Sequence, residues 1–138
     1  MPLTRILDTN ILSDLLKHPA GKASNRIAAL PSEEIAAMGT SIIVAAELRY
    51  GAAKKGSALL KQRAEQLLKA IPVLPLAPEA GRFYGDLRKH LEDAGEIIGG
   101  NDLLIASHAL AIDAVLVTDN MREFQRVPGL KLENWLRP

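Results

Sequence analysis

Three acidic residues stand where structural elements are expected to begin or end, and a fourth lies within an expected helix. Asp8 follows the apolar run 3–7, Asp119 follows the run 114–118, Asp102 lies in the first turn of an apolar helix, and Glu47 lies among apolar residues of another helix. Carboxylates that converge repel and desolvate one another, so they need a cation. Oxygen ligands suit Mg²⁺ or Mn²⁺, and such an ion can activate water and stabilise charge on a phosphoryl group. The four acids are therefore candidates for an acidic cation site.

Each of these acids also has an ordinary structural explanation. An Asp between a strand and a helix commonly caps the helix, which would suffice for Asp8. Asp102 favours the helix dipole, Glu47 could face solvent, and Asp119 with the following Asn120 is a normal turn pair. Residue types and spacing alone leave both interpretations open.

Composition excludes several kinds of protein. The chain has 138 residues, 48% of them hydrophobic, and its 17 basic and 16 acidic side chains give a net charge of +1, which excludes a highly basic nucleic-acid binder. It has no Cys, and the three His at 18, 90 and 108 show neither ligand spacing nor the paired arrangement of a metal-free ribonuclease. Neither a membrane span nor a signal-peptide core is visible, so we expect a cytoplasmic protein.

Short apolar runs alternate with helical periodicity along the chain. Strands are expected at 3–7, 35–38, 72–76, 114–118 and 130–132, and helices over 11–18, 20–30, 41–55, 57–71, 78–94 and 101–112, with Asn101 capping the last. This alternation predicts one α/β domain over 1–138, with a parallel sheet between helices. Sites in such sheets form beyond the carboxyl ends of the strands, where the candidate acids lie.

Four sequence blocks resemble a known family. Residues 6–10 (ILDTN) resemble the N-terminal motif of PIN domains, and residues 46–52 (AELRYGA) resemble the central motif of VapC-type toxins. Residues 99–109 (GGNDLLIASHA) resemble the third motif, and residues 117–124 (VTDNMREF) resemble the C-terminal block. The blocks occur in family order and cover essentially the whole chain.

The resemblance implies a fold, an activity and partners. It implies a PIN-like three-layer sandwich with a parallel sheet of four or five strands. It also implies a Mg²⁺- or Mn²⁺-dependent endoribonuclease toxin that cleaves RNA, with tRNA the expected class. A VapB-like antitoxin and a homodimer are the expected assemblies.

The resemblance also assigns residues by position. Asp8, Glu47 and Asp102 match the first three acids of the family; Asp119 is expected as the fourth, with Glu123 as the competing candidate. All four acids are expected to be catalytic, and Asp8, Asp102 and Asp119 are expected to hold the metal. The polar residues expected to orient acids or bound waters are Thr9, Asn10, Thr118, Asn120 and Glu123. Arg49 and Arg122, beside motif acids, are expected to contact substrate phosphates.

Two questions stay open at this stage. A catalytically weak PIN-like module that only binds RNA or protein is the alternative to an enzyme, although all four motif acids are present. The basic surplus between residues 47 and 69 could steer phosphates or could be ordinary solvated helix surface.

Overall fold

Five parallel strands form one sheet at the centre of the molecule. The computed structural model describes residues 3–138. The sheet order is β3-β2-β1-β4-β5, and every neighbouring pair is parallel. The strands are β1 (Arg5–Leu7), β2 (Met38–Ser41), β3 (Val73–Leu74), β4 (Val115–Val117) and β5 (Leu132–Glu133). The α/β class and the parallel sheet expected from the sequence are confirmed.

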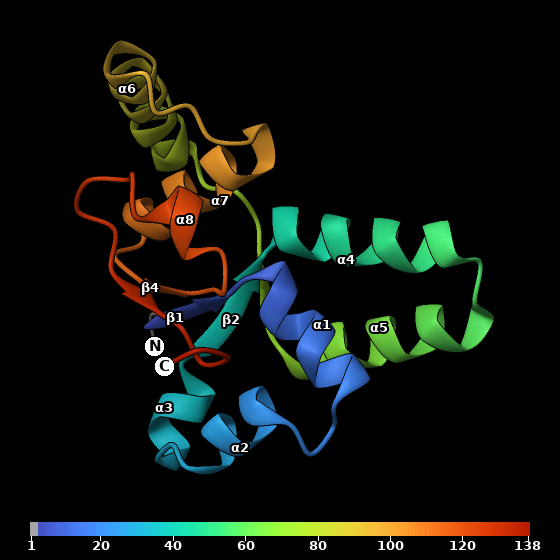
Figure 1. Ribbon diagram of the computed structural model, residues 1–138. Coiled ribbons are helices and arrows are strands. Elements are labelled where there is room, and N and C mark those ends of the chain that lie inside the picture. The colour runs from blue at the N-terminus through green and yellow to red at the C-terminus, as the bar shows by residue number, and fades with distance from the viewer. Residues whose placement is uncertain (1–2) are drawn as a thin grey trace.

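Helices cover both faces of this sheet. In chain order they are α1 (Thr9–Lys17), α2 (Lys22–Ala28), α3 (Ser32–Ala36), α4 (Ile42–Lys55), α5 (Ala58–Ala70), α6 (Pro78–Ala94), α7 (Gly100–Ala111) and α8 (Met121–Phe124). Helices α1, α2 and α5 lie on one side, and α6, α7 and α8 lie on the other (Figure 1). Helices α4 and α5 run beside each other as a hairpin that extends away from the sheet (Figure 1). This is the predicted three-layer arrangement.

The chain changes direction between β1 and β4. From β1 it builds outward through β2 to β3, and it then returns to place β4 and β5 on the other side of β1. Leu7 and Val117, the last residues of β1 and β4, are paired in register. Asp8 and Thr118 therefore emerge side by side at the carboxyl ends of adjacent strands. Such a switch point is where open α/β sheets bind ligands.

Local capping explains where the helices of the hairpin begin and end. The hydroxyl of Ser41 accepts a hydrogen bond from the backbone N–H of Ile43 at 3.2 Å, so α4 starts directly after β2. Helix α4 ends at Gly56, whose φ of 66° is the left-handed conformation that glycine adopts without strain. Ser57 then accepts from the N–H of Leu60 at 3.1 Å and starts α5.

The region before β2 differs from the expectation. The strand expected at 35–38 is wrong: residues 32–36 form α3, and β2 begins at Met38. The helix expected over 20–30 is shorter, since α2 covers only 22–28. Inside β2, a Cβ on Gly39 would lie 2.2 Å from Cδ1 of Leu3 and 2.9 Å from the carbonyl oxygen of Pro72. Leu3 and the backbone of Pro72 thus approach β2 so closely that position 39 requires glycine. A β-branched residue would otherwise be expected in a buried central strand.

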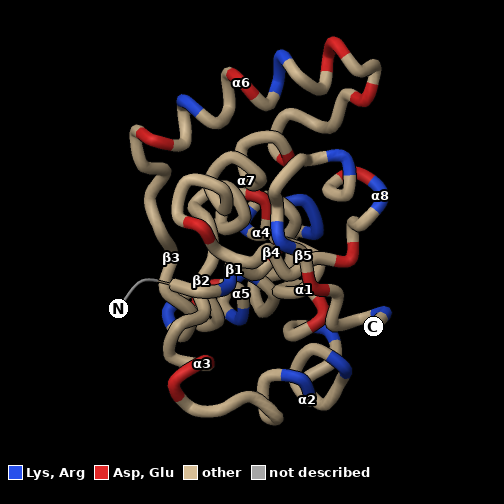
Figure 2. The backbone as a smooth tube through the Cα atoms, turned by 90° about the vertical axis from the view of Figure 1, so that its left-hand side faces the viewer, with Lys and Arg blue, Asp and Glu red and all other residues tan. Residues whose placement is uncertain are grey.

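The long helix α6 lies at the outer edge of the molecule. Its outer side carries alternating acidic and basic residues (Figure 2), among which Arg88 pairs with Glu92 and Lys89 with Asp93. Its inner side packs against α7. Within residues 3–138, no helix combines the length and the apolar character needed to cross a membrane.

Candidate active site

Asp8 is buried at the start of α1. Its side chain is 4% exposed and caps the helix, because Oδ1 accepts from the backbone N–H of Thr9 at 2.8 Å. Its other oxygen accepts from the hydroxyl of Thr118 at 2.6 Å. Burial raises the pKa of Asp8, and the hydrogen bonds from Thr118 and Thr9 offset this only in part. Asp8 is therefore both a helix cap and a poorly solvated carboxylate, so the two interpretations of it are compatible.

Asn10 fixes the orientation of Asp8 relative to the end of β4. Its amide nitrogen lies 3.4 Å from Oδ2 of Asp8 and 3.3 Å from Oγ1 of Thr118. Its amide oxygen accepts from the backbone N–H of Asp119 at 2.9 Å. One carboxamide thus ties the carboxylate of Asp8 to the neighbouring strand end.

Glu47 reaches the same region from α4. Packing of α1 against α4 brings its Oε1 within 2.6 Å of the hydroxyl of Thr9, which donates a hydrogen bond. Its Oε2 accepts from the side-chain amide of Asn101 at 3.3 Å. Asn101 was expected to cap α7, but the cap position is Gly99 and Asn101 instead contacts Glu47.

Asp102 and Glu123 face each other across Asn120. The amide nitrogen of Asn120 lies 3.2 Å from Oδ2 of Asp102 and 2.8 Å from Oε2 of Glu123. The backbone N–H of Gly99 donates to the other oxygen of Glu123 at 3.2 Å. Burial, with the adjacent Glu123 carboxylate, raises the pKa of Asp102 to about 8, whereas the hydrogen bonds from Asp102 and Asn120 lower the pKa of Glu123. A cation bound beside this pair would favour the ionised form of both carboxyl groups.

The structure does not bring Asp119 to the other acids. Its Oδ1 accepts from the side-chain amide of Asn134 at 3.0 Å and lies 3.1 Å from Nε of Arg137. The C-terminal segment thus binds the carboxylate of Asp119. Asp119 was expected as the fourth acid, but the acid that lies beside Asp102 is Glu123.

The two arginines expected to contact substrate also lie apart from the acids. Arg49 forms a two-pronged ion pair with Glu65 of α5, at 2.8 and 3.0 Å, on the exposed surface. Arg122 is exposed at the start of α8. Neither residue lines the cavity that contains Asp8.

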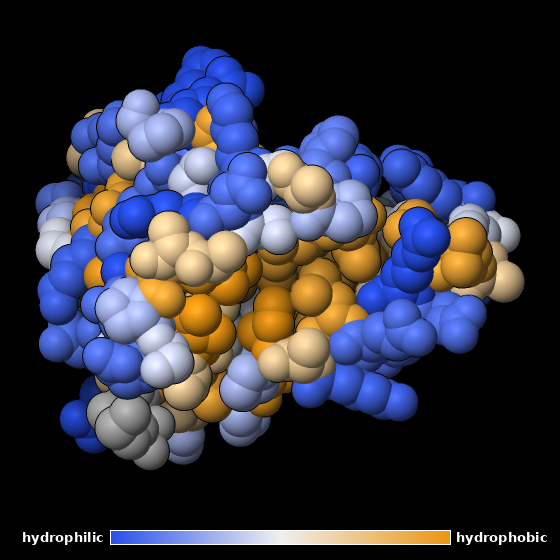
Figure 3. Space-filling view, turned by 90° about the horizontal axis from the view of Figure 1, so that it is seen from below, coloured by the Kyte–Doolittle hydropathy of each residue, from blue (hydrophilic) through white to orange (hydrophobic). Residues whose placement is uncertain are grey.

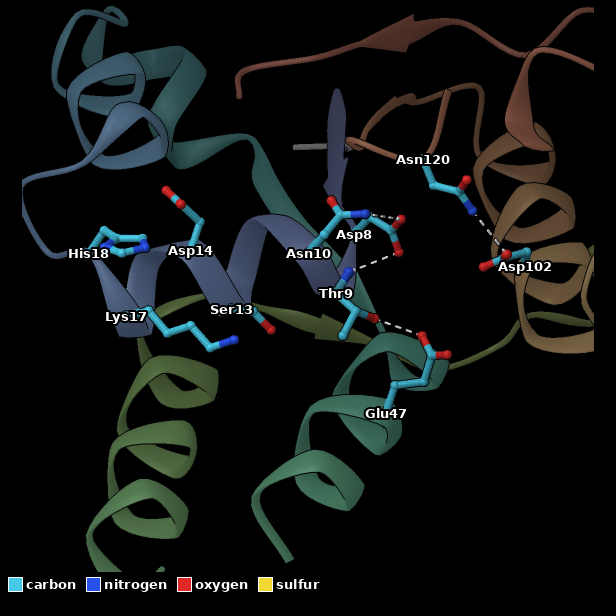
Figure 4. Close-up of a pocket in the computed structure, with 10 residues that line it drawn as sticks. All are labelled: Asp8, Thr9, Asn10, Ser13, Asp14, Lys17, His18, Glu47, Asp102 and Asn120. Carbon is cyan, nitrogen blue, oxygen red and sulfur yellow. Dashed lines mark hydrogen bonds between the residues drawn. The ribbon is translucent and has the colours of Figure 1, made fainter. Parts of the chain in front are cut away.

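An open cavity of about 550 Å³ joins three of the acids. Figure 4 shows Asp8, Glu47 and Asp102 around one end of it, and the outer part of α1 along the other. Its lining residues are Asp8, Thr9, Asn10, Ser13, Asp14, Lys17, His18, Glu47, Asp102 and Asn120. Sequence reasoning missed Ser13, Lys17 and their neighbours. The sequence does contain a feature that could have identified them. Thr9, Ser13 and Lys17 are spaced four residues apart, which places them on one face of α1.

The donor set fits a hard divalent cation. The groups that face the cavity are carboxylates and side-chain amides and hydroxyls, which are oxygen donors. No three acidic or histidine side chains within residues 3–138 are close enough to form a complete ligand set. Mg²⁺ does not need one, because it keeps several waters and commonly binds through one or two carboxylates plus substrate phosphate. Burial raises the pKa of Asp8 and of Asp102, and a bound cation would offset this by favouring the ionised form of both.

The family of the chain follows from its match to known proteins. The model of the PIN domain matches residues 5–130. Ribonuclease VapC2 of Rickettsia felis is 42% identical over 132 residues, which are 94% of this chain and 96% of that protein. The chain belongs to the PIN-domain family, among the VapC ribonucleases.

Other relatives are consistent with this placement. A tRNA(fMet)-specific endonuclease VapC from Salmonella typhimurium is 36% identical over 99 residues, which are 69% of this chain and 73% of that one. A solved structure of VapBC2 from Rickettsia felis, bound to a DNA fragment from their promoter, superposes with a TM-score of 0.85 and 38% identity over 96% of this chain and 99% of that chain. The PIN-like fold expected from the sequence is thereby confirmed.

Proposed function

We propose that the chain is a divalent-metal-dependent endoribonuclease toxin that hydrolyses phosphodiester bonds of tRNA. One observation carries the proposal: Asp8, Glu47 and Asp102 come from three separate segments and line one open, polar cavity, and Glu123 lies beside Asp102 across Asn120. A binding module would gain nothing from such burial of like charges, which costs free energy. The names of the relatives support RNA as the substrate and tRNA as its class.

We assign Asp8, Asp102 and Glu123 to the metal, which they would hold directly or through bound water, with Glu123 in place of Asp119. A bound Mg²⁺ or Mn²⁺ supplies an ionised water and stabilises charge on the phosphoryl group. Thr118 and Asn10 hold the Asp8 carboxylate, and Asn120 holds Asp102 and Glu123 in one orientation. Glu47, fixed by Thr9 and Asn101, orients water at the rim of the same cavity.

Cleavage assays with defined substrates test the activity. The purified chain is incubated with tRNA, single-stranded DNA or a small phosphate ester, in Mg²⁺, Mn²⁺ or EDTA. We expect cleavage of tRNA only, and only with a metal. Replacing both Asp8→Asn and Asp102→Asn should abolish it while the far-ultraviolet circular dichroism stays unchanged. Cleavage in EDTA, or by the double variant, would reject the assignment.

A VapB-like antitoxin is the partner we propose. The VapBC structures of relatives support it. A band of apolar residues crosses the face seen in Figure 3, between hydrophilic flanks, and such contiguous apolar surface is typical of protein interaction sites. Co-expression with the antitoxin should relieve growth inhibition by the chain alone.

A homodimer and a cytoplasmic location complete the proposal. Light scattering on the purified chain should give twice the mass of 14.9 kDa. The cytoplasm is where a tRNA substrate and an antitoxin would be met, and cell fractionation measures this.

A further inference from the structure

A second cavity continues the first along α1. It has a volume of about 160 Å³ and shares Thr9, Ser13, Lys17 and Glu47 with the cavity that contains Asp8. Its other lining residues come from α1, α4 and the start of α5, and most are apolar or small: Leu16, Leu48, Gly51, Ala52, Lys55 and Leu60. The two cavities therefore form one continuous depression, which we call the α1–α4 groove.

Two lysines stand along this groove. Lys17 lies in the last turn of α1, eight residues after Thr9 and about 12 Å farther along the helix. Its side chain extends along α1 on the cavity side, near Ser13 (Figure 4). Lys55 is the last residue of α4 and lines the second cavity. The acids thus lie at one end of the groove and both cationic side chains lie farther along it.

The charges of these two lysines are not neutralised within the part of the chain that the structure describes. Neither Lys17 nor Lys55 forms an ion pair or a side-chain hydrogen bond there, whereas Arg49 is bound to Glu65 and Lys131 to Asp113. An exposed ammonium group beside a groove is available to a phosphate, and Arg49 is not.

We propose that the α1–α4 groove holds the RNA strand that flanks the scissile bond, with Lys17 and Lys55 contacting its phosphates. The inference rests on the proposed function. The acidic end alone would repel a polyanion, so affinity for RNA must come from cations outside it. The apolar floor formed by Leu16 and Leu48 packs against ribose and base faces, while the lysines contact the backbone. The charge complementarity favours an RNA strand over a peptide as the occupant.

Salt-dependent binding tests the two lysines. Labelled tRNA is titrated with the Asp102→Asn chain, which keeps the RNA intact, alone and with Lys17→Gln or Lys55→Gln added. Each added substitution should reduce the slope of log K against log salt by about 0.7 to 0.9, as expected for one lost phosphate contact. If the two chains bind equally at 1 M salt, this difference in slope makes the affinity of the substituted chain about four- to fivefold lower at 0.15 M salt. Lys54→Gln, one residue from Lys55 but outside both cavities, is the matched control and should leave the slope unchanged.

Kinetics separate positioning of RNA from chemistry. In the active chain, Lys17→Gln and Lys55→Gln should raise KM and leave kcat near the wild-type value, because both lysines are remote from the acids.

If the two substitutions change the slope no more than Lys54→Gln does, the groove proposal is overturned while the nuclease assignment stands. If they weaken binding of the VapB-like antitoxin but not of tRNA, the groove belongs to a peptide and the proposal is likewise overturned. If the wild-type chain binds tRNA with a lysine-dependent slope and cleaves nothing, the proposed function fails and the groove remains an RNA site.

Discussion

Asp119 and Glu123 lie four residues apart, yet their carboxylates face different parts of the molecule. Asp119 follows β4 directly and contacts Asn134 and Arg137 of the C-terminal segment. Glu123 is carried on the single turn of α8, which returns its side chain to Asn120 and the N–H of Gly99. The short helix was not expected from the sequence, and it places Glu123 beside Asn120 and Asp102.

Substitution of these two acids should have unequal effects. Glu123→Gln should reduce kcat/KM by about 10- to 100-fold, because it removes a charge beside Asp102 and weakens metal binding. Asp119→Asn should leave kcat/KM close to wild type, since its carboxylate contacts only the C-terminal segment. Steady-state cleavage at several Mg²⁺ concentrations measures both. Equal losses in the two variants would return Asp119 to the metal site.

Sequence reasoning named the acids and several of the polar residues that contact them, but it did not find the contact of Glu47 with α7. Asp8 and Asp102 could be named because each lies at the end or start of a recognisable element, and Glu47 because it lies in a block that resembles a VapC motif. The contact of Glu47 with Asn101 joins positions 54 residues apart, and it depends on how α4 packs beside α7. No local pattern encodes that packing, so the contact of Glu47 with Asn101 emerges only from the folded structure.

Helices α4 and α7 carry Glu47 and Asp102, and a buried histidine joins them. Nδ1 of His108 lies 2.8 Å from the hydroxyl of Ser41, the residue that caps α4. His108 is 1% exposed, and burial lowers its pKa from the usual 6.5. In this position His108 is a packed core residue, bonded to Ser41 and remote from solvent.

The stability of the chain should therefore depend on pH through His108. A histidine whose pKa is lower in the folded state contributes its full stability above pH 6.5, and this contribution is lost as the pH falls below that value. The loss is at most about 1.4 kcal/mol per pH unit for one proton. Urea unfolding at pH 7.5, 6.5 and 5.5 should show a steeper decline for wild type than for His108→Gln.

His90→Gln is the control for this measurement. His90 is exposed on α6, so its substitution should reproduce the wild-type pH profile. A His108→Gln profile that runs parallel to wild type would show that His108 does not titrate with unfolding.

The elements that sequence patterns predicted are those with strong local signals. Apolar runs give β1 and β4, and Ser41, Ser57, Gly56 and Gly95 mark the ends of α4, α5 and α6. Strand β2 (Met38–Ser41) was misplaced because its sequence, MGTS, lacks the apolar, β-branched character of a buried strand. Its place between β1 and β3 depends on close packing around Gly39, which is a tertiary effect.

The acidic side chains of the site should destabilise the folded chain when no cation is bound. Without a cation, Asp102 is partly buried beside Glu123, Asp8 and Glu47, all of which raise its pKa. In EDTA at pH 8.5, Asp102→Asn should raise the free energy of unfolding by about 1–2 kcal/mol, a figure reduced for solvent screening. This corresponds to an increase in Tm of roughly 3–6 °C.

Added Mg²⁺ should reverse the order of the Tm values of wild type and Asp102→Asn. A ligand that binds only the folded state stabilises it, so Mg²⁺ should raise the Tm of wild type and raise that of Asp102→Asn less. Differential scanning calorimetry in EDTA and in Mg²⁺ gives both numbers. Identical Tm values in EDTA together with identical responses to Mg²⁺ would place the cation elsewhere.

The acids that we assign to the site lie at positions 8, 47, 102 and 123 of 138 residues, so only a fragment that spans residues 8–123 contains all of them. A polypeptide still emerging from the ribosome carries Asp8 and Glu47 long before α8 has been made. Cleaving ability consequently arises only near the end of synthesis. A product that is truncated before residue 123 lacks at least one of these acids, and we expect it to leave RNA intact.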